Sequence, residues 1–361
     1  HGYWQIRVHP DDRDYLAFTV PVLHGSYRWT VLAMGCKSSA AIFQRAMDQV
    51  LAPFSSSNTF RVRQGGYEGP TASPTGPGFN GAATADQADK GKYKVKEGIA
   101  FGTAFSYVDD CLIVSVGSRE EHVALVDAVF QAFQKHQFIF KLSKTELYKQ
   151  EMDFLGHRLT QSGVTRQAAK VEAIQKWELP KTQEELRSFL SVLGYYRRFV
   201  DGFAKLAQPL SDMLREGEFQ LPFSPAAAEA FYELRRRMAS APILKYFDPR
   251  HETELWTDAS AKAIGGAVLQ RDERGNLRPV AYYSRRLSPS EENYSTYQRE
   301  LLGIRDCLLA FRFYLIGMHF VVKTDHSSLR WLTEQPEMSS LQARWYTVFQ
   351  DYHIKEIQYV K

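Results

Sequence analysis

The first part of the chain changes from strand-like to helix-like spacing of its apolar residues. Residues 3–8 and 15–20 alternate apolar and polar positions on either side of the polar turn at residues 9–12. Apolar residues then recur at helical spacing over residues 39–51, and Pro53 follows them. This stretch therefore predicts two strands joined by a turn, and then one helix that ends before the proline.

The middle of the chain predicts one hairpin and a series of helices. Two short apolar strands enclose an acidic turn near residues 105–114. N-cap residues, two of them with a glutamate at capping-box spacing, mark helix starts at Ser118 with Glu121, Thr182 with Glu185, and Ser224 before Pro225. The last of these helices is expected to run toward Met238.

From about Asp248 the elements follow a different order. Strand patterns at residues 254–257, 263–270 and 278–283, the last two joined by the polar turn at 272–276, predict a meander of hairpins. A long helix is expected from Ser288, where N-cap, proline and capping glutamate coincide, and a strand at residues 319–324 follows. Three hairpin strands, a helix, another strand and more helix predict a mixed α/β layer fold.

The composition is globular except in one segment. Hydrophobic residues at 44% and charged residues at 24% exclude a disordered, collagenous or coiled-coil protein. No apolar run reaches membrane-spanning length, so we expect a soluble protein. The 3 cysteines lie far apart and indicate a reducing compartment. In residues 55–104, Gly, Pro, Ser and Thr make up 21 of 50 residues, which predicts a disordered insertion.

The positive charge is concentrated in one region. The whole chain carries 45 − 41 = +4, but residues 135–215 alone hold 14 Lys and Arg against 9 Asp and Glu, a local +5. A solvated charged face is the commoner meaning of such a surplus. A polyanionic partner is the functional alternative, and it stays open at this point.

Asp109 and Asp110 stand at the tip of the predicted hairpin. Aspartates favour tight turns, and for an arbitrary Asp-Asp pair this structural interpretation is the commoner one. A solvated turn, however, has no need of the apolar Phe105, Tyr107 and Leu112 around it. Two adjacent carboxylates on a rigid hairpin offer the oxygen ligands that Mg²⁺ takes while it keeps substrate phosphates in its remaining positions.

A second set of acids is spread over three elements. Asp258 and Asp325 end predicted strands, and Glu300 shares an apolar helix face with Cys307 and Phe311. A buried carboxylate is costly unless it is protonated, paired or bound to a metal. Singly, such acids are more often caps or salt-bridge partners. Jointly, they can converge above a sheet, which favours a metal site.

These residues carry a resemblance to the Pol polyproteins of gypsy-type LTR retrotransposons. Residues 107–110, Tyr-Val-Asp-Asp, resemble the Tyr-X-Asp-Asp box of reverse transcriptases. The other segments resemble, in the family's order, the palm helix region (34–44), the primer-grip hairpin (154–157), the thumb-to-connection region (193–199) and the ribonuclease H domain (257–260, the helix around Glu300, and 324–327). Together they cover nearly everything except residues 55–104.

The resemblance implies the fold class and the domains. We expect an α+β reverse transcriptase palm of the ferredoxin or RRM-like type, with a helical thumb and connection, followed by a mixed α/β ribonuclease H-like domain. The expected boundaries are residues 1–54 and 105–165 for the palm, 55–104 for the insertion, 166–247 for the thumb and connection, and 248–361 for the ribonuclease H-like domain.

The resemblance also implies two chemistries, RNA-directed DNA polymerase and ribonuclease H, with two Mg²⁺ or Mn²⁺ ions at each active site. Asp109 and Asp110 would hold the ions that activate a primer 3′-hydroxyl. Asp258, Glu300 and Asp325 would hold those that activate water against the RNA strand of a hybrid. Nucleotide or template-primer contacts are expected at six positions, namely Tyr3 (under the incoming sugar), Met34, Gln44, Lys144 (proton donor), Phe154 and Gly156.

The implied partners are an RNA template, a DNA primer, the RNA–DNA hybrid and dNTPs, with no membrane. Protease and integrase modules are expected on the same parent chain, in an intracellular setting: the cytoplasm, a virus-like particle or the nucleus.

Several positions depart from the family pattern. The third polymerase acid should lie five residues before Tyr3, and a fourth ribonuclease H acid after the last strand, so both fall outside residues 1–361. Ala33, Met34 and Ala40 replace residues that the family usually has there. We therefore expect residues 1–361 alone to be poorly active. A decayed or co-opted copy that only binds nucleic acid or partners stays an alternative.

Overall fold

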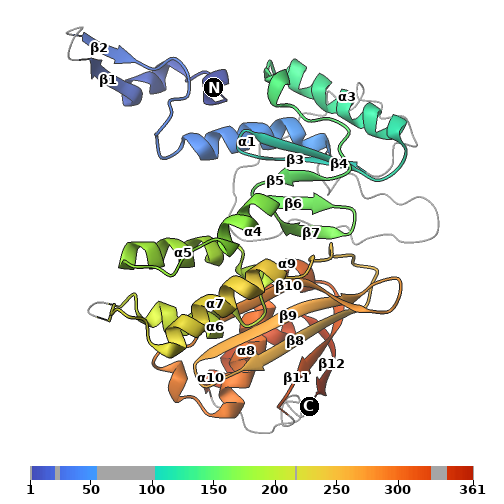
Figure 1. Cartoon of the computed structure of the whole chain (residues 1–361). Coiled ribbons are helices and arrows are strands. Elements are labelled where there is room, and N and C mark those ends of the chain that lie inside the picture. The colour runs from blue at the N-terminus through green and yellow to red at the C-terminus, as the bar shows by residue number, and fades with distance from the viewer. Residues whose placement is uncertain (1, 21–24, 55–101, 216–217, 327–339, 361) are drawn as a thin grey trace. The chain divides into compact units, whose positions relative to one another are not determined.

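The computed structural model describes residues 2–20, 25–54, 102–215, 218–326 and 340–360 (Figure 1). The chain divides into two compact units, His1–Leu147 and Tyr148–Lys361. The expected boundaries at residues 165 and 247 fall inside the second unit and stay predictions. Nearly all of the predicted insertion at 55–104 lies outside the described residues. Among the described helices, none is long and apolar enough to span a membrane.

The first unit begins with short elements. They are the 3-10 helices η1 (Tyr3–Gln5) and η2 (Pro10–Leu16) and the antiparallel strands β1 (Ala17–Val20) and β2 (Gly25–Arg28). The strand predicted at residues 3–8 is therefore wrong. Only Arg7 pairs, in an isolated bridge with Val31. An alternating pattern forms a strand only where a partner strand pairs along it, and none of the described residues does so here.

The rest of this unit packs two helices on one hairpin. Its elements are α1 (Ser39–Leu51), the 3-10 helix η3 (Ala52–Phe54), β3 (Gly102–Tyr107), β4 (Asp110–Ser115), α3 (Arg119–Lys135) and the 3-10 helix η4 (Leu142–Lys144). The predicted helix 39–51 and the capping box of Ser118 and Glu121 are confirmed. Phe43, Val129 and Phe133 from the two helices bury their side chains together.

The second unit starts with a small antiparallel sheet and a group of helices. The strands are β5 (Met152–Phe154), β6 (His157–Thr160) and β7 (Gly163–Arg166). The helices are α4 (Ala168–Gln175), α5 (Gln183–Tyr195), the 3-10 helix η5 (Arg197–Phe199), α6 (Phe203–Asp212) and α7 (Pro225–Ser240). The N-caps Thr182 and Ser224 form as predicted. Phe189, Phe231 and Leu234 are fully buried in the core of these helices.

The remaining residues form a mixed five-stranded sheet with helices. The strands are β8 (Thr253–Ala259), β9 (Ala263–Arg271), β10 (Leu277–Arg286), β11 (His319–Thr324) and β12 (His353–Tyr359), in the order β10-β9-β8-β11-β12. The helices are the 3-10 helix η6 (Glu291–Asn293), α8 (Thr296–Ala310), α9 (Arg312–Leu315) and α10 (Ser340–Gln350). β8 to β10 are antiparallel, and β11 is parallel to β8 and β12. The predicted mixed α/β layer is confirmed.

The long helix α8 starts later than its sequence predicts. Ser288 and Glu291 do exchange the hydrogen bonds of a capping box, but these cap only the single turn η6. A second capping box, between Ser295 and Gln298, starts α8 itself. The predicted start at Ser288 is therefore wrong, because the chain turns out of the helix at Tyr294, whose backbone is extended.

The two faces of the five-stranded sheet have different neighbours. Leu255 and Val268 point to one face and pack against Leu301 and Ile304 of α8. On the other face, α6 contacts β9 and β10. Its position is fixed there at both ends, because the Ala204 amide donates to Ser284 Oγ at 2.9 Å, and Asp212 pairs with Arg286.

Candidate active sites

The Asp109-Asp110 pair sits on a two-residue turn between β3 and β4. Tyr107 pairs with Asp110, so Val108 and Asp109 form the turn itself, and both carboxylates are exposed. Val108 has φ +53°, in the left-handed region that a β-branched side chain rarely occupies. Such a conformation costs on the order of 1–3 kcal/mol and persists only where neighbouring contacts enforce it.

Gln44 supplies those contacts. From α1, its side-chain oxygen accepts the Val108 amide at 2.6 Å, and its Nε2 donates to the Ser106 carbonyl at 3.0 Å. The same Nε2 also donates to Asp48 at 2.8 Å. Gln44, predicted to lie near template and nucleotide, therefore positions the acidic turn through its amide. Its template contact stays a prediction.

The N-terminal segment reaches the same turn. A Cβ on Gly2 would lie 3.4 Å from Asp109 Cβ, so the backbone before Tyr3 passes directly beside this aspartate. The Tyr3 ring packs edge-on against Phe43 with 5.3 Å between ring centroids. The structure thus brings Tyr3, Gln44 and Asp109 into one neighbourhood. Their roles toward a nucleotide stay predictions.

Two other predicted contact residues are exposed in the same unit. Met34 lies in the turn before α1 and is 51% exposed. Lys144 ends η4 and is exposed as well. No hydrogen bond or ion pair among the described residues joins either side chain to the acidic turn, so their expected roles stay predictions.

The hairpin predicted at residues 154–157 forms between β5 and β6. Leu155 and Gly156 have φ +46° and +73°, which is the backbone of a tight two-residue hairpin turn. Both turn carbonyls accept hydrogen bonds from α5 and its C-cap: the Tyr195 hydroxyl donates to Leu155 at 2.5 Å, and the Tyr196 hydroxyl to Gly156 at 2.8 Å. The two tyrosines are thus positioning residues that sequence reasoning did not assign.

Asp258 and Asp325 occupy matching places on neighbouring strands. β8 and β11 are parallel, and Thr257 pairs with Thr324, so the two aspartates are the next residues on adjacent strands. Neighbouring strands lie about 4.8 Å apart. Both carboxylates are exposed at this sheet edge. The convergence of these two strand-end acids, predicted from sequence, is therefore set by strand register.

Glu300 completes this group from α8. It is only 2% exposed, and its Oε2 has no hydrogen-bond partner among the described residues. Desolvation, first, and then the charges of Asp325 and Asp258 raise the pKa of Glu300 to about 8, against smaller lowering effects of the Ala259 backbone and Arg299. The three carboxylates therefore share one electrostatic site.

This donor set fits a divalent cation in its chemistry. In the described ranges, no three Asp, Glu, His or Cys side chains already stand close enough together to form a preformed metal cluster. Nevertheless, the charges of the three carboxylates act on one another, and Glu300 is a buried carboxylate with an unpaired oxygen. A bound cation would relieve both the desolvation of Glu300 and its repulsion by the two aspartates.

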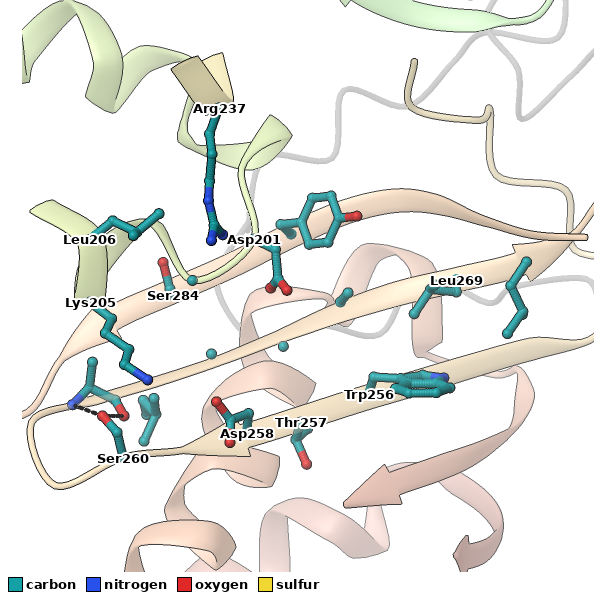
Figure 2. A pocket seen from close by; sticks show the side chains of 18 residues that line it. Asp201, Lys205, Leu206, Arg237, Trp256, Thr257, Asp258, Ser260, Leu269 and Ser284 are labelled. Atoms are coloured by element: carbon teal, nitrogen blue, oxygen red, sulfur yellow. Dashed lines mark hydrogen bonds between the residues drawn. The ribbon is translucent and has the colours of Figure 1, made fainter. Parts of the chain in front are cut away.

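A cavity of about 520 Å³ opens on the face of the sheet that carries α6 (Figure 2). Strand register explains it. Asp258, Gly265 and Ser284 form one row across β8, β9 and β10, and Trp256, Ala267 and Tyr282 form the next. In these two rows β9 thus contributes the small residues Gly265 and Ala267, between larger residues of β8 and β10. Lys205 of α6, Arg237 of α7 and Asp201 of the turn before α6 face the sheet.

Comparison with known proteins defines the class. Residues 1–159 match the family model described as "Reverse transcriptase (RNA-dependent DNA polymerase)", and residues 248–352 match "RNase H-like domain found in reverse transcriptase". The chain carries the reverse transcriptase and RNase H-like domains of an LTR-retrotransposon Pol polyprotein.

Particular relatives agree with this class. The chain is 29% identical over its whole length to the retrovirus-related Pol polyprotein from transposon 297 of Drosophila melanogaster, and it spans 29% of that protein. It is 32% identical over 70% of its length to the transposon Tf2-3 polyprotein of Schizosaccharomyces pombe, and it covers 19% of that protein. The chain thus spans less than a third of the curated relatives that it matches.

Solved structures show the same fold. A foamy viral protease-reverse transcriptase in complex with double-stranded DNA superposes with a TM-score of 0.73 at 20% identity, over 100% of this chain and 55% of that one. The corresponding complex with an RNA/DNA hybrid gives 0.72 at 21% identity, over 100% of this chain and 43% of that one. The expected fold class is confirmed by these similarities.

Proposed function

We propose that this chain is the catalytic part of a gypsy-type reverse transcriptase with RNA-directed DNA polymerase and ribonuclease H activities. The observation that carries the proposal is the grouping of Asp258 and Asp325, in matching register on parallel strands, around the buried Glu300. The exposed Asp109-Asp110 turn on the same chain supports the polymerase half.

At the polymerase site, Asp109 and Asp110 would hold two Mg²⁺ or Mn²⁺ ions, which supply activation of a primer hydroxyl and stabilisation of the leaving pyrophosphate. The chain's own contribution is rigid placement. Gln44 fixes the turn through Val108 and Ser106, so the two carboxylates are held before substrate arrives. The aromatic ring of Tyr3, beside Phe43, would lie under the sugar of the incoming nucleotide.

At the ribonuclease H-like site, Asp258, Glu300 and Asp325 would hold two such ions, which supply activated water for cleavage of an RNA phosphodiester. Glu300 is buried on the face of α8, so its carboxylate is fixed by packing. The two aspartates stay exposed at the sheet edge, where an RNA strand can approach them.

The proposed partners are an RNA template, a DNA primer, their hybrid and dNTPs. The local surplus of +5 over residues 135–215 supports a surface that grips nucleic-acid phosphates with little regard to sequence. The similar foamy viral enzymes were solved with double-stranded DNA and with an RNA/DNA hybrid. The relatives' descriptions as polyproteins support further modules, such as protease and integrase, on the parent chain.

Primer extension tests the polymerase half. The chain is expressed with the coding sequence that flanks it on both sides, and incorporation of nucleotides on a primed RNA template is followed with Mg²⁺. We expect Asp110→Asn to abolish incorporation and the exposed Asp127→Asn, on α3, to leave it unchanged. Absence of incorporation by the unsubstituted protein, with normal binding of template-primer, would favour a decayed copy that only binds nucleic acid.

A further inference from the structure

One cation at the cavity beside Asp258 has no described partner. Lys205 projects from α6 toward the end of β8, where Asp258 and Ser260 lie (Figure 2). Its ammonium group makes no hydrogen bond or ion pair with any other residue that the structure describes. Arg237, the second cation facing the cavity, is engaged differently, because it pairs with Glu233 at 2.7 Å.

The position of Lys205 is fixed by its helix. The Ala204 amide, one residue before it, donates to Ser284 on β10, and Asp212 at the end of α6 pairs with Arg286. α6 begins after Gly202, whose φ of +62° turns the chain onto the sheet. A cation carried on a helix that is fastened at two points cannot drift far from the strand end it faces.

The space in front of Lys205 is kept open by the sheet. Gly265 lies between Asp258 and Ser284 in one row across the strands, so no side chain fills the row's centre. Ser260 shapes the turn after β8: its hydroxyl accepts the Ala263 amide at 3.0 Å. The opening beside Asp258 is therefore defined by the register of three strands and by the position of α6.

A lysine without a described partner, beside a carboxylate that would hold metal ions, is suited to bind phosphate. Lysine binds phosphate as a point charge, and contacts to backbone phosphates position nucleic acid without reading its sequence. A phosphodiester cleaved at Asp258 is followed on the same strand by further phosphates, each with a negative charge. Of the two cations that line the cavity, Lys205 can bind such a phosphate without giving up an ion pair, whereas Arg237 pairs with Glu233.

We propose that Lys205 is a positioning residue of the ribonuclease H-like site, and that it binds a phosphodiester of the RNA strand next to the one cleaved at Asp258. The site is then composite, because β8, the residue after β11 and helix α8 supply the acids, and α6 supplies the cation. This inference rests on the proposed ribonuclease H function.

The test compares three variants of the chain expressed with its flanking coding sequence: Lys205→Ala, Lys205→Arg, and the control Lys355→Ala, which removes an exposed lysine from the edge strand β12. Binding of a short RNA–DNA hybrid is measured by fluorescence anisotropy across a salt series without divalent cations. We expect Lys205→Ala to lower the slope of log Kd against log salt by about 0.9, the value for one phosphate contact, with Lys205→Arg and Lys355→Ala unchanged. Hybrid cleavage with Mg²⁺ should show a raised KM and an unaltered kcat for Lys205→Ala alone.

The outcomes separate this inference from the proposed function. An unchanged salt slope and KM in Lys205→Ala, with cleavage abolished by Asp258→Asn, would overturn the inference and keep the function. Failure of the unsubstituted chain to bind hybrid, or cleavage that survives Asp258→Asn, would remove the proposed function and this inference with it. A fall in kcat for Lys205→Ala that Lys205→Arg does not rescue would assign a merely structural role and overturn the inference.

Discussion

Glu300 should make the stability of the ribonuclease H-like part fall as pH rises. Burial and the two aspartates raise its pKa from 4.5 to about 8 in the folded state. The folded state therefore keeps the proton where the unfolded state has lost it. The contribution of the Glu300 proton to the free energy of unfolding is full below the unfolded pKa. It declines as pH rises between the two pKa values, and it is lost above the folded pKa.

The magnitude follows from the shift. From 4.5 to about 8 is roughly 3.5 units, and at about 1.4 kcal/mol per unit this is on the order of 5 kcal/mol. Glu300→Gln removes the charge at nearly constant shape, so the free-energy cost of a buried, ionised carboxylate at high pH should disappear. Relative to the unsubstituted chain, we expect the variant to gain roughly 4 kcal/mol between about pH 5 and about pH 8.5.

Urea unfolding in EDTA, at about pH 5 and at about pH 8.5, measures the difference in free energy of unfolding between Glu300→Gln and the unsubstituted chain. A short hydrogen-exchange pulse at a common pH, read by mass spectrometry in peptides from β8 and α8, reports unfolding of this part alone. The reasoning would be refuted if the stability difference between Glu300→Gln and the unsubstituted chain were the same at both pH values. In Mg²⁺ the order should reverse at high pH, because a cation bound to the folded state stabilises the chain with three carboxylates more than the variant with two.

Three further predictions concern the residues that position the two hairpins and two glycines of the second unit. Gln44→Ala leaves the turn amide unpaired and should cost about 2–3 kcal/mol in urea unfolding followed by exchange of β3 peptides, with a matching loss of primer extension. Tyr196→Phe should cost about 1 kcal/mol in the second unit, and the 54%-exposed Tyr195→Phe less; equal costs would contradict the burial argument. Gly163→Ala places a Cβ 2.0 Å from the Leu244 carbonyl oxygen, at φ +139°, and should lower the free energy of unfolding by more than about 3 kcal/mol. Gly194→Ala, on α5 with open space around it, should raise it by up to about 1 kcal/mol in the same unfolding assay.

The sequence pattern correctly predicted those helices that are determined by residues close together in the chain. The helix at residues 39–51 and the N-caps at Ser118, Thr182 and Ser224 are confirmed, since caps and apolar stripes act within one or two turns. The strand predicted at residues 3–8 failed because a strand needs a partner, and the alternating pattern cannot show that the partner forms only one bridge.

The start of α8 shows a second limit. Ser288 and Glu291 form the capping box that their spacing predicts, yet it caps a single turn. Tyr294 then leaves the helical path, and its ring packs near Trp345 with 5.7 Å between centroids. Where a helix continues after its cap thus depends on packing against residues far along the chain.

The acids of both candidate sites could be named from sequence, but the groups that position them could not. Gln44 reaches the acidic turn across 64 residues of sequence, and Tyr196 reaches Gly156 across 40. Lys205 faces Asp258 only because α6 is fastened to β10. Such contacts depend on the folded arrangement and leave no local trace in residue spacing.

The central claim is that one polypeptide holds two separate metal-dependent sites. It is tested most directly by measuring nucleotide incorporation and RNA–DNA hybrid cleavage on the same preparations of the chain with its flanking sequence, with Mg²⁺. We predict that Asp110→Asn abolishes incorporation and spares cleavage, and that Asp258→Asn abolishes cleavage and spares incorporation. Loss of both activities in either correctly folded variant, or retention of both, would contradict the account.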